Sequence, residues 1–252
     1  MAPLKRPTTT LPYLDNMKSF LLIFLLGVFS FASAEAADKP NYSDKPANPA
    51  MARIEDDPKL PRVLLIGDSI SIGYTLPVRS LLAGRANVHR IPANGGPTTN
   101  GLAHVEEWLG TNRWHVIHFN WGLHDLKILS DGRHMVPIDQ YEKNLEELVR
   151  RLQKTGAKLI WASTTPVPEG KLGPLRKPGD EIAYNVAAMR VMEKNGVSLN
   201  DLYAFALPQL AKIQSPANVH FTSDGSAVLA EPVAKAISTA LAPLGRTSST
   251  SS

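Results

Sequence analysis

The stretch Val63-Leu64-Leu65-Ile66-Gly67-Asp68-Ser69-Ile70 decides the fold that we expect for this chain. Its four apolar residues are typical of a short buried strand, and a helix-like pattern follows the Gly-Asp-Ser turn. In an α/β protein such a turn lies where the strand ends, and the next helix aims its N–H groups at negative charge there. The turn can therefore present a nucleophile, and the alternative is that Asp68 and Ser69 only cap the helix. It is not the G-x-S-x-G elbow, because Ser71 stands where the second glycine would be.

Short apolar runs alternate with amphipathic stretches along the rest of the chain. The predicted strands are residues 63–66, 88–91, 116–120 and 159–162, with a weaker pattern at 196–199. The predicted helices lie near residues 72–82, 102–109, 138–154 and 181–194, and a last one follows residues 222–224 and runs to about residue 241. This alternation predicts a parallel sheet with helices on both faces, in a single domain.

The N-terminal region has the pattern of a secretory signal peptide. Met17-Lys18 precedes the apolar residues 20–29, and Ala32-Ser33-Ala34 supplies an A-x-A cleavage site. We expect a secreted or periplasmic protein with no stable membrane insertion, and an uncleaved anchor is the alternative. The expected organisation is an upstream extension and signal peptide at 1–36, an extended lead-in at 37–60, the folded domain at 61–243 and a disordered tail at 244–252.

Composition and charge exclude several classes of function. The 252-residue chain has no cysteine, which excludes disulfides, thiolate metal sites, cysteine nucleophiles and a lipoprotein anchor. Its net charge of +4 falls to +3 without residues 1–36 and is spread along the chain, which gives no indication of nucleic-acid binding. The histidines outside the motifs described next have no metal-ligand spacing, and we expect neither a metal nor another cofactor.

Three further polar segments follow predicted strands or precede the last helix. They are Asn94-Gly95-Gly96-Pro97-Thr98-Thr99, Trp121-Gly122-Leu123-His124-Asp125 and Asn218-Val219-His220-Phe221-Thr222. Together with the Gly-Asp-Ser turn, their order and spacing resemble the blocks of the SGNH (GDSL-type) hydrolases over roughly residues 62–240. The resemblance implies a three-layer α/β/α sandwich with a parallel, flavodoxin-like five-stranded sheet. It also implies hydrolysis of esters, thioesters or amides.

The resemblance assigns roles to single residues. Ser69 matches the family nucleophile, whose backbone N–H also serves the oxyanion hole, and Gly96 matches the glycine that supplies the second N–H. His220 matches the base that takes the proton from Ser69. For Gly96, the alternative is that the glycine only permits the turn before Pro97.

Two positions depart from the family pattern. His124 replaces the asparagine that is the third oxyanion donor, and a neutral imidazole can still present one N–H, with a protonation state that would make activity depend on pH. A substrate contact and a structural role are the other interpretations of His124. Ala217 replaces the aspartate three residues before His220, so a backbone carbonyl or the Asn218 side chain would have to accept from the imidazole, leaving a Ser–His dyad.

Other residues are expected to shape the site. Trp121 follows its strand directly and is predicted to stand at the mouth of the site as a substrate contact, as is Asn94, with packing inside the loop as the alternative for Trp121. Asp125 is expected to tie down its own loop. Residues 164–179 form a long Pro/Gly/Lys segment, a candidate wall of the substrate cleft.

These observations predict an exported serine esterase that acts on a short acyl ester, acetyl first, of a small molecule or a glycan. A glycan-binding protein on a degenerate SGNH scaffold is the first alternative, favoured by Ala217 and His124. The second is a glycosidase that uses carboxylates such as Asp125 or Glu169 on the same fold.

Overall fold

The computed structural model describes residues 48–242 of the chain. The chain divides into two units, Met1–Asp44 and Lys45–Ser252, and all of the described residues belong to the second. The predicted signal peptide, the first part of the lead-in and the tail at 244–252 lie outside the described residues. The expectations for these segments therefore stay predictions.

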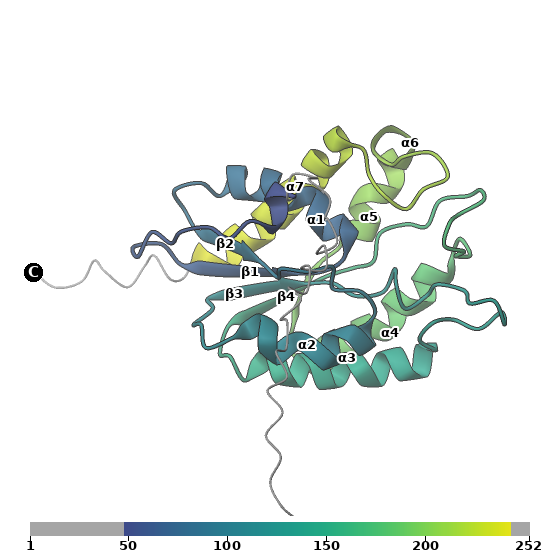
Figure 1. Cartoon of the computed structure of the whole chain (residues 1–252), viewed down its shortest axis with the longest axis horizontal. Coiled ribbons are helices and arrows are strands. Elements are labelled where there is room, and N and C mark those ends of the chain that lie inside the picture. Colours follow the sequence, from purple (N-terminus) through teal and green to yellow (C-terminus); the bar gives the residue numbers. More distant parts are fainter. Residues whose placement is uncertain (1–47, 243–252) are drawn as a thin grey trace, which may run out of the picture. The chain divides into compact units, whose positions relative to one another are not determined.

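Five parallel strands form one sheet in the order β2-β1-β3-β4-β5 (Figure 1). Their bounds are β1 Arg62–Ile66, β2 Asn87–Arg90, β3 Val116–Phe119, β4 Lys158–Ala162 and β5 Ser198–Asn200. In register, Val63 of β1 lies opposite both Val88 and Val116. Every residue of β3 is buried, as expected for a strand covered on both faces. The predicted parallel sheet is confirmed.

Helices cover both faces of this sheet, which confirms the predicted three-layer sandwich. On one face α1 (Ser69–Leu81) packs against α7 (Ser223–Leu241), and α7 also contacts β3, β4 and β5. On the other face α3 (Ile138–Gln153) lies between α2 (Thr98–Leu109) and α4 (Asp180–Lys194) (Figure 1). The strands end toward the right in Figure 1, where the long connecting loops gather.

Short helical segments fill the connection between β5 and α7. They are α5 Leu202–Ala206, the 3₁₀ turn η2 Leu207–Gln209 and α6 Leu210–Ile213. The sequence pattern does not predict them, because four or five residues are too few to show a helical period. They lead the chain back to the loop that carries His220.

The folded unit begins earlier than the predicted residue 61. A 3₁₀ turn, η1 (Pro49–Met51), packs against α1, and Ala50 is only 2% exposed. Arg79 of α1 donates to the carbonyls of Pro49 at 3.3 Å and Ala52 at 3.1 Å. The proline-rich composition suggested an extended lead-in, but residues from 48 onward are docked on the domain by these contacts.

Among residues 48–242, no helix is both long and apolar enough to cross a membrane.

Candidate active site

The Gly-Asp-Ser turn joins the end of β1 to the start of α1. Asp68 is the N-cap of α1, with its carboxylate accepting from the N–H of Ile70 at 2.9 Å, and Ser69 is the first helical residue. Gly67 is required here, because a Cβ at this position would lie 2.7 Å from the Cβ of Ser71. Ser69 is half-buried at the helix N-terminus, where the peptide dipoles favour negative charge.

A buried arginine that the sequence analysis missed holds this turn. The guanidinium of Arg90, at the end of β2, donates to the carbonyls of Gly67 at 2.8 Å and Asp68 at 3.0 Å. It also donates to the carbonyl of Ala93 at 2.7 Å, and burial lowers its pKa to about 10. A charged residue within a strand of the sheet could have marked Arg90 in the sequence, but not the carbonyls that it binds. Arg90 thereby fixes the turn that carries Ser69 relative to the segment that follows β2.

His220 lies on a narrow loop between α6 and α7. Gln214 and Phe221 form an antiparallel bridge, and the N–H of Ser215 donates to the carbonyl of His220 at 2.9 Å. Gly225 in the first turn of α7 packs so closely that a Cβ there would lie 1.9 Å from the carbonyl oxygen of Ile213. The loop is therefore anchored at both ends, although His220 itself is exposed.

The structure brings Ser69 and His220 together. His220 Nε2 lies 2.8 Å from Ser69 Oγ, and His220 Nδ1 lies 2.7 Å from Asn218 Oδ1. The same Asn218 oxygen accepts the backbone N–H of His220 at 3.0 Å. Because a backbone N–H can only donate, the atom facing it must be the amide oxygen. Nδ1 therefore carries the proton, and Nε2 is left free to accept from the hydroxyl of Ser69.

The position of the family aspartate is occupied by an exposed Ala217 in a left-handed conformation, with φ of 48°. The N–H of Asn218 donates to the carbonyl of Ser215 at 3.2 Å, closing a tight turn over Pro216 and Ala217. Of the two acceptors that the sequence analysis left open for His220, the structure shows the Asn218 side chain. The partner of the imidazole is therefore a neutral amide from the next residue along the chain.

The segment after β2 contacts the serine turn through backbone groups. The N–H of Gly95 donates to the carbonyl of Gly67 at 2.9 Å, and a Cβ at Gly95 would lie 2.9 Å from that oxygen. Gly96, with φ of 61°, donates its N–H to Asn94 Oδ1 at 3.0 Å. Asn94 is therefore a local cap of the Gly96 N–H in this structure, rather than a free substrate contact. The amide of Asn94 must turn away before Gly96 can serve an oxyanion.

His124 is half-buried after β3, beside two cationic side chains. Its Nδ1 lies 2.9 Å from Lys127 Nζ. Burial lowers the pKa of His124 to about 4, the charges of Lys127, Arg176 and His220 lower it further, and Asp68 opposes them. With a pKa of about 4 the His124 ring is neutral near pH 7, so the pH dependence expected from its protonation would lie at acidic pH.

Two residues of the same segment point into the protein. Asp125 is fully buried and accepts from the N–H of Thr98 at 2.8 Å and from its hydroxyl at 2.5 Å, which ties this segment to the start of α2. Burial raises the pKa of Asp125 to about 7. The predicted substrate contact at Trp121 is wrong, because its side chain is 0% exposed. Gly101 of α2 makes room for the indole, since a Cβ there would lie 2.8 Å from Trp121 Cζ2.

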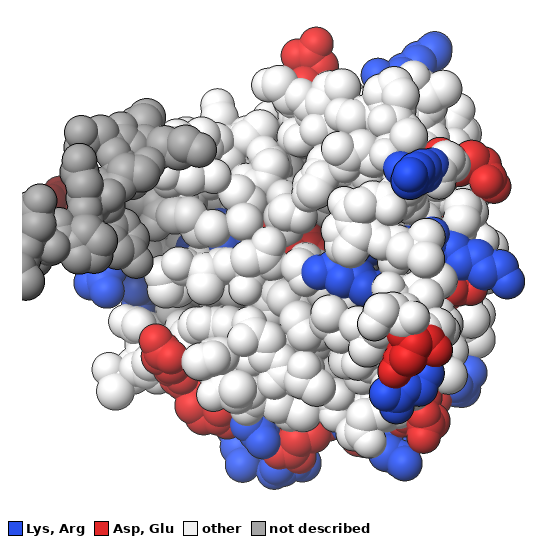
Figure 2. All heavy atoms as spheres, turned by 45° about the vertical axis from the view of Figure 1, so that its right-hand side comes forward, with Lys and Arg blue, Asp and Glu red and all other residues white. Residues whose placement is uncertain are grey.

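The predicted cleft wall, residues 164–179, borders the His220 loop. Gln214 donates to the carbonyl of Pro166 at 3.0 Å, and Gly170 lies so close to Ala217 that a Cβ on it would be 2.9 Å from the Ala217 Cβ. Arg176 donates to the carbonyl of Leu123 at 2.7 Å, so the same wall also touches the His124 segment. Figure 2 turns this edge of the sheet toward the viewer, and on the face shown Lys and Arg are interspersed with Asp and Glu.

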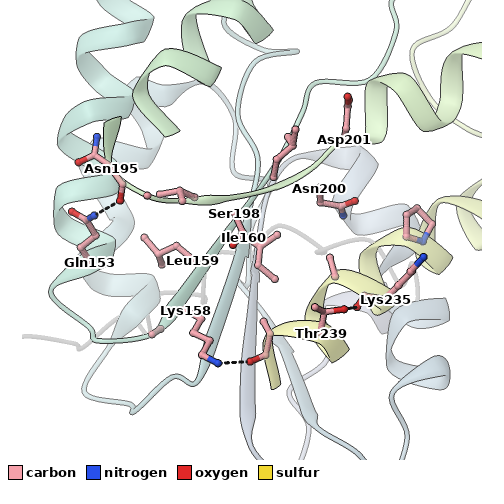
Figure 3. Close-up of a pocket in the computed structure, with 17 residues that line it drawn as sticks. Gln153, Lys158, Leu159, Ile160, Asn195, Ser198, Asn200, Asp201, Lys235 and Thr239 are labelled. Carbon is pink, nitrogen blue, oxygen red and sulfur yellow. Dashed lines mark hydrogen bonds between the residues drawn. The ribbon is translucent and has the colours of Figure 1, made fainter. Parts of the chain in front are cut away.

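A hollow of about 730 Å³ lies apart from Ser69, along β5 and the second half of α7 (Figure 3). Lys158 donates to the carbonyl of Ala240 across one end at 2.7 Å, and Gln153 donates to the carbonyl of Asn195 at 3.1 Å. No histidine is among the residues that line it, so it lacks a hydroxyl–imidazole pair. Three smaller hollows, of about 540, 430 and 340 Å³, are also lined by residues other than Ser69 and His220.

Within the described residues, no group of three or more His, Asp or Glu side chains is placed to hold a metal ion.

The comparisons with known proteins identify the family of the chain. A family model described as "GDSL-like Lipase/Acylhydrolase family" matches residues 65–228, which contain the serine turn, both intermediate segments and His220. The protein is a carboxylic ester hydrolase. The chain belongs to the GDSL-like lipase/acylhydrolase family, the SGNH hydrolases. No curated protein matches it significantly.

Solved structures share the fold at low sequence identity. An acetyl xylan esterase, AlAXEase, is 19% identical with a TM-score of 0.60, covering 70% of this chain and 99% of its own. A lipase/acylhydrolase from Enterococcus faecalis is 19% identical with a TM-score of 0.61, covering 71% and 96%. The acetylxylan esterase Axe2 from Geobacillus stearothermophilus is 18% identical with a TM-score of 0.57, covering 70% and 94%.

Proposed function

We propose that this protein is an exported esterase that removes short acyl groups, acetyl first, from carbohydrates by means of Ser69 and His220. The observation that carries the proposal is the 2.8 Å contact between Ser69 Oγ and His220 Nε2 at the N-terminus of α1. A hydroxyl activated by an imidazole acceptor is the arrangement that acyl transfer to serine requires.

The reaction divides into two acyl transfers. Ser69 Oγ attacks the ester carbonyl while its proton moves to His220 Nε2, and the tetrahedral oxyanion is stabilised by the N–H of Ser69 and an N–H from His124. The N–H of Gly96 joins them once Asn94 has turned away from it. His220 then protonates the departing alcohol, and water, deprotonated by the same imidazole, releases the acyl group from Ser69.

One observation favours a large substrate. His220 is exposed on its loop, so its imidazole can be reached from the surface. An exposed catalytic group suits a polymer that lies across the site. The acetyl xylan esterases among the structural neighbours support a carbohydrate acetyl ester as the first substrate to test.

The placement of the residues that each function needs distinguishes the esterase from the two alternatives. A glycosidase needs two carboxylates that reach the substrate. Glu169 is exposed, but Asp125 is buried and bound to Thr98, so it cannot be the second carboxylate. A pure glycan-binding scaffold would not need a hydroxyl and an imidazole in hydrogen-bond contact. We therefore favour the esterase.

The test combines labelling with a matched substrate pair. A fluorophosphonate should label the wild-type protein at Ser69, and Ser69→Ala should not be labelled. The wild type should release acetate from acetylated xylan and leave the chemically deacetylated polymer unchanged. Labelling of Ser69→Ala, or cleavage of the deacetylated polymer, would contradict the proposal.

A further inference from the structure

The contact between Lys127 and His124 has a consequence for the oxyanion hole. Lys127 Nζ lies 2.9 Å from His124 Nδ1, and an ammonium group has only donors. Nδ1 must therefore accept, which leaves it without a proton. In the neutral ring the single proton must then lie on Nε2.

Backbone hydrogen bonds fix the segment that carries these two residues. The carbonyl of Lys127 accepts from the N–H of Met135 at 2.7 Å, and the carbonyl of Asp125, between the two residues, accepts from the N–H of Val136 at 3.0 Å. Leu123, directly before His124, is fixed through its carbonyl by Arg176 at 2.7 Å. Lys127 and His124 thus occupy a short segment whose backbone is bonded on both sides, and both residues are half-buried.

We infer that Lys127 is a positioning residue that holds His124 as a neutral Nε2–H donor, and so allows a histidine to do the work of the family asparagine. This inference rests on the proposed function. An asparagine amide always presents an N–H, whereas an imidazole can present Nε2 either as donor or as acceptor. The ammonium of Lys127 removes that ambiguity, and its charge also polarises the ring so that Nε2–H is a stronger donor to an oxyanion.

Most of the charges around the ring also favour the neutral form of His124. Lys127, Arg176 and His220 disfavour a second proton on His124, and Asp68 is the group that favours one. Burial adds to the first effect. His124 therefore keeps a single N–H across the pH range in which His220 must act as a base.

The tautomer can be measured without any variant. Nitrogen NMR of the intact protein, with the His124 signals assigned by comparison with His124→Asn, should show Nε2 protonated and Nδ1 unprotonated at neutral pH. A proton on Nδ1 would overturn the inference. This measurement does not use activity, so its failure is distinct from a failure of the esterase proposal, which the labelling of Ser69 tests.

A double-mutant cycle tests the consequence for catalysis. Lys127→Met should lower kcat about tenfold with little change in KM, because it weakens a donor that acts on developing charge. In a His124→Asn background the same substitution should have no effect on kcat, since an amide does not need a tautomer to be set. Equal losses in both backgrounds would show a structural role for Lys127 and overturn the inference.

Lys143→Met is the matched control for the loss of one positive charge. The Lys143 side chain is 71% exposed on α3, and its ion pair with Asp139 is a long one at 3.9 Å. It should leave kcat and KM unchanged. If Lys143→Met lowers kcat as much as Lys127→Met does, the effect comes from net charge and the inference fails.

Discussion

Two histidines near the carboxyl edge of the sheet have different neighbours at the ring nitrogen Nδ1. His220 is exposed, and its Nδ1 faces an oxygen of Asn218 at 2.7 Å. His124 is half-buried, and its Nδ1 faces the ammonium of Lys127 at 2.9 Å. An acceptor at Nδ1 makes Nε2 an acceptor, and a donor at Nδ1 makes Nε2 a donor. The group that faces Nδ1 therefore decides which histidine can be a base and which can stabilise an anion.

The largest effect on kcat should come from removing His220, the base, or Ser69, the nucleophile. His220→Ala should lower kcat by about 10³-fold or more, and Ser69→Ala by a similar factor, because the two groups act as one unit. Steady-state hydrolysis of p-nitrophenyl acetate measures both. The double variant should be no slower than either single one. Ser69→Ala should keep the thermal midpoint of the wild type, and a well-folded variant with full activity would contradict the serine mechanism.

The next largest effect concerns the donor. His124→Ala should lower kcat by about 10²-fold with a smaller change in KM, as expected for an oxyanion donor. His124→Asn should retain most of the activity. Since the pKa of His124 is about 4, the wild type and His124→Asn should have pH–rate profiles of the same shape above pH 5. A change confined to KM in His124→Ala would make it a substrate-binding residue instead.

Substitution of Asn218, which accepts from His220 Nδ1, should have a moderate effect on kcat. Asn218→Ala should lower kcat about tenfold, because the imidazole loses the partner that orients it and sets its tautomer. Asn218→Asp keeps both hydrogen bonds and adds a negative charge that favours the imidazolium. Its kcat should equal or exceed that of the wild type, and the acid limb of its pH–rate profile should move to higher pH. An unchanged acid limb in Asn218→Asp would show that residue 218 does not act on the ring.

The difference between the two histidines was only partly predictable from the sequence. The turn at Ser69 and the base at His220 follow local patterns that mark strand ends and helix starts, and the structure places them in contact. The roles of Arg90 and Lys127 depend on which carbonyl or ring nitrogen the fold brings beside them, and no local pattern contains that information. The position of Trp121 was predicted wrongly for a similar reason, because the space that its indole fills is left by Gly101 of α2, which is distant in the sequence.

The buried Asp125, next to His124 in the sequence, should make the free energy of unfolding depend on pH. Burial raises its pKa to about 7, above the usual value near 4, so the fold favours the protonated form. The stability that it contributes is fully present below about pH 4 and is lost as the pH rises through about 7. Asp125→Asn cannot ionise. Urea unfolding at several pH values should show the wild type losing on the order of 1–3 kcal/mol relative to this variant between pH 4 and 7, and parallel curves would contradict the burial argument.

The smallest expected effect lies in the loop of His220. Ala217 has φ of 48°, in the left-handed region that disfavours residues with a Cβ. Ala217→Gly should therefore raise the free energy of unfolding by up to about 1 kcal/mol, because glycine adopts this conformation without strain. Since Asn218 and not residue 217 contacts the imidazole, kcat should not change. Urea unfolding at constant pH measures the first quantity and esterase kinetics the second. A loss of activity in a more stable Ala217→Gly protein would show that the strained turn itself holds His220 against Ser69.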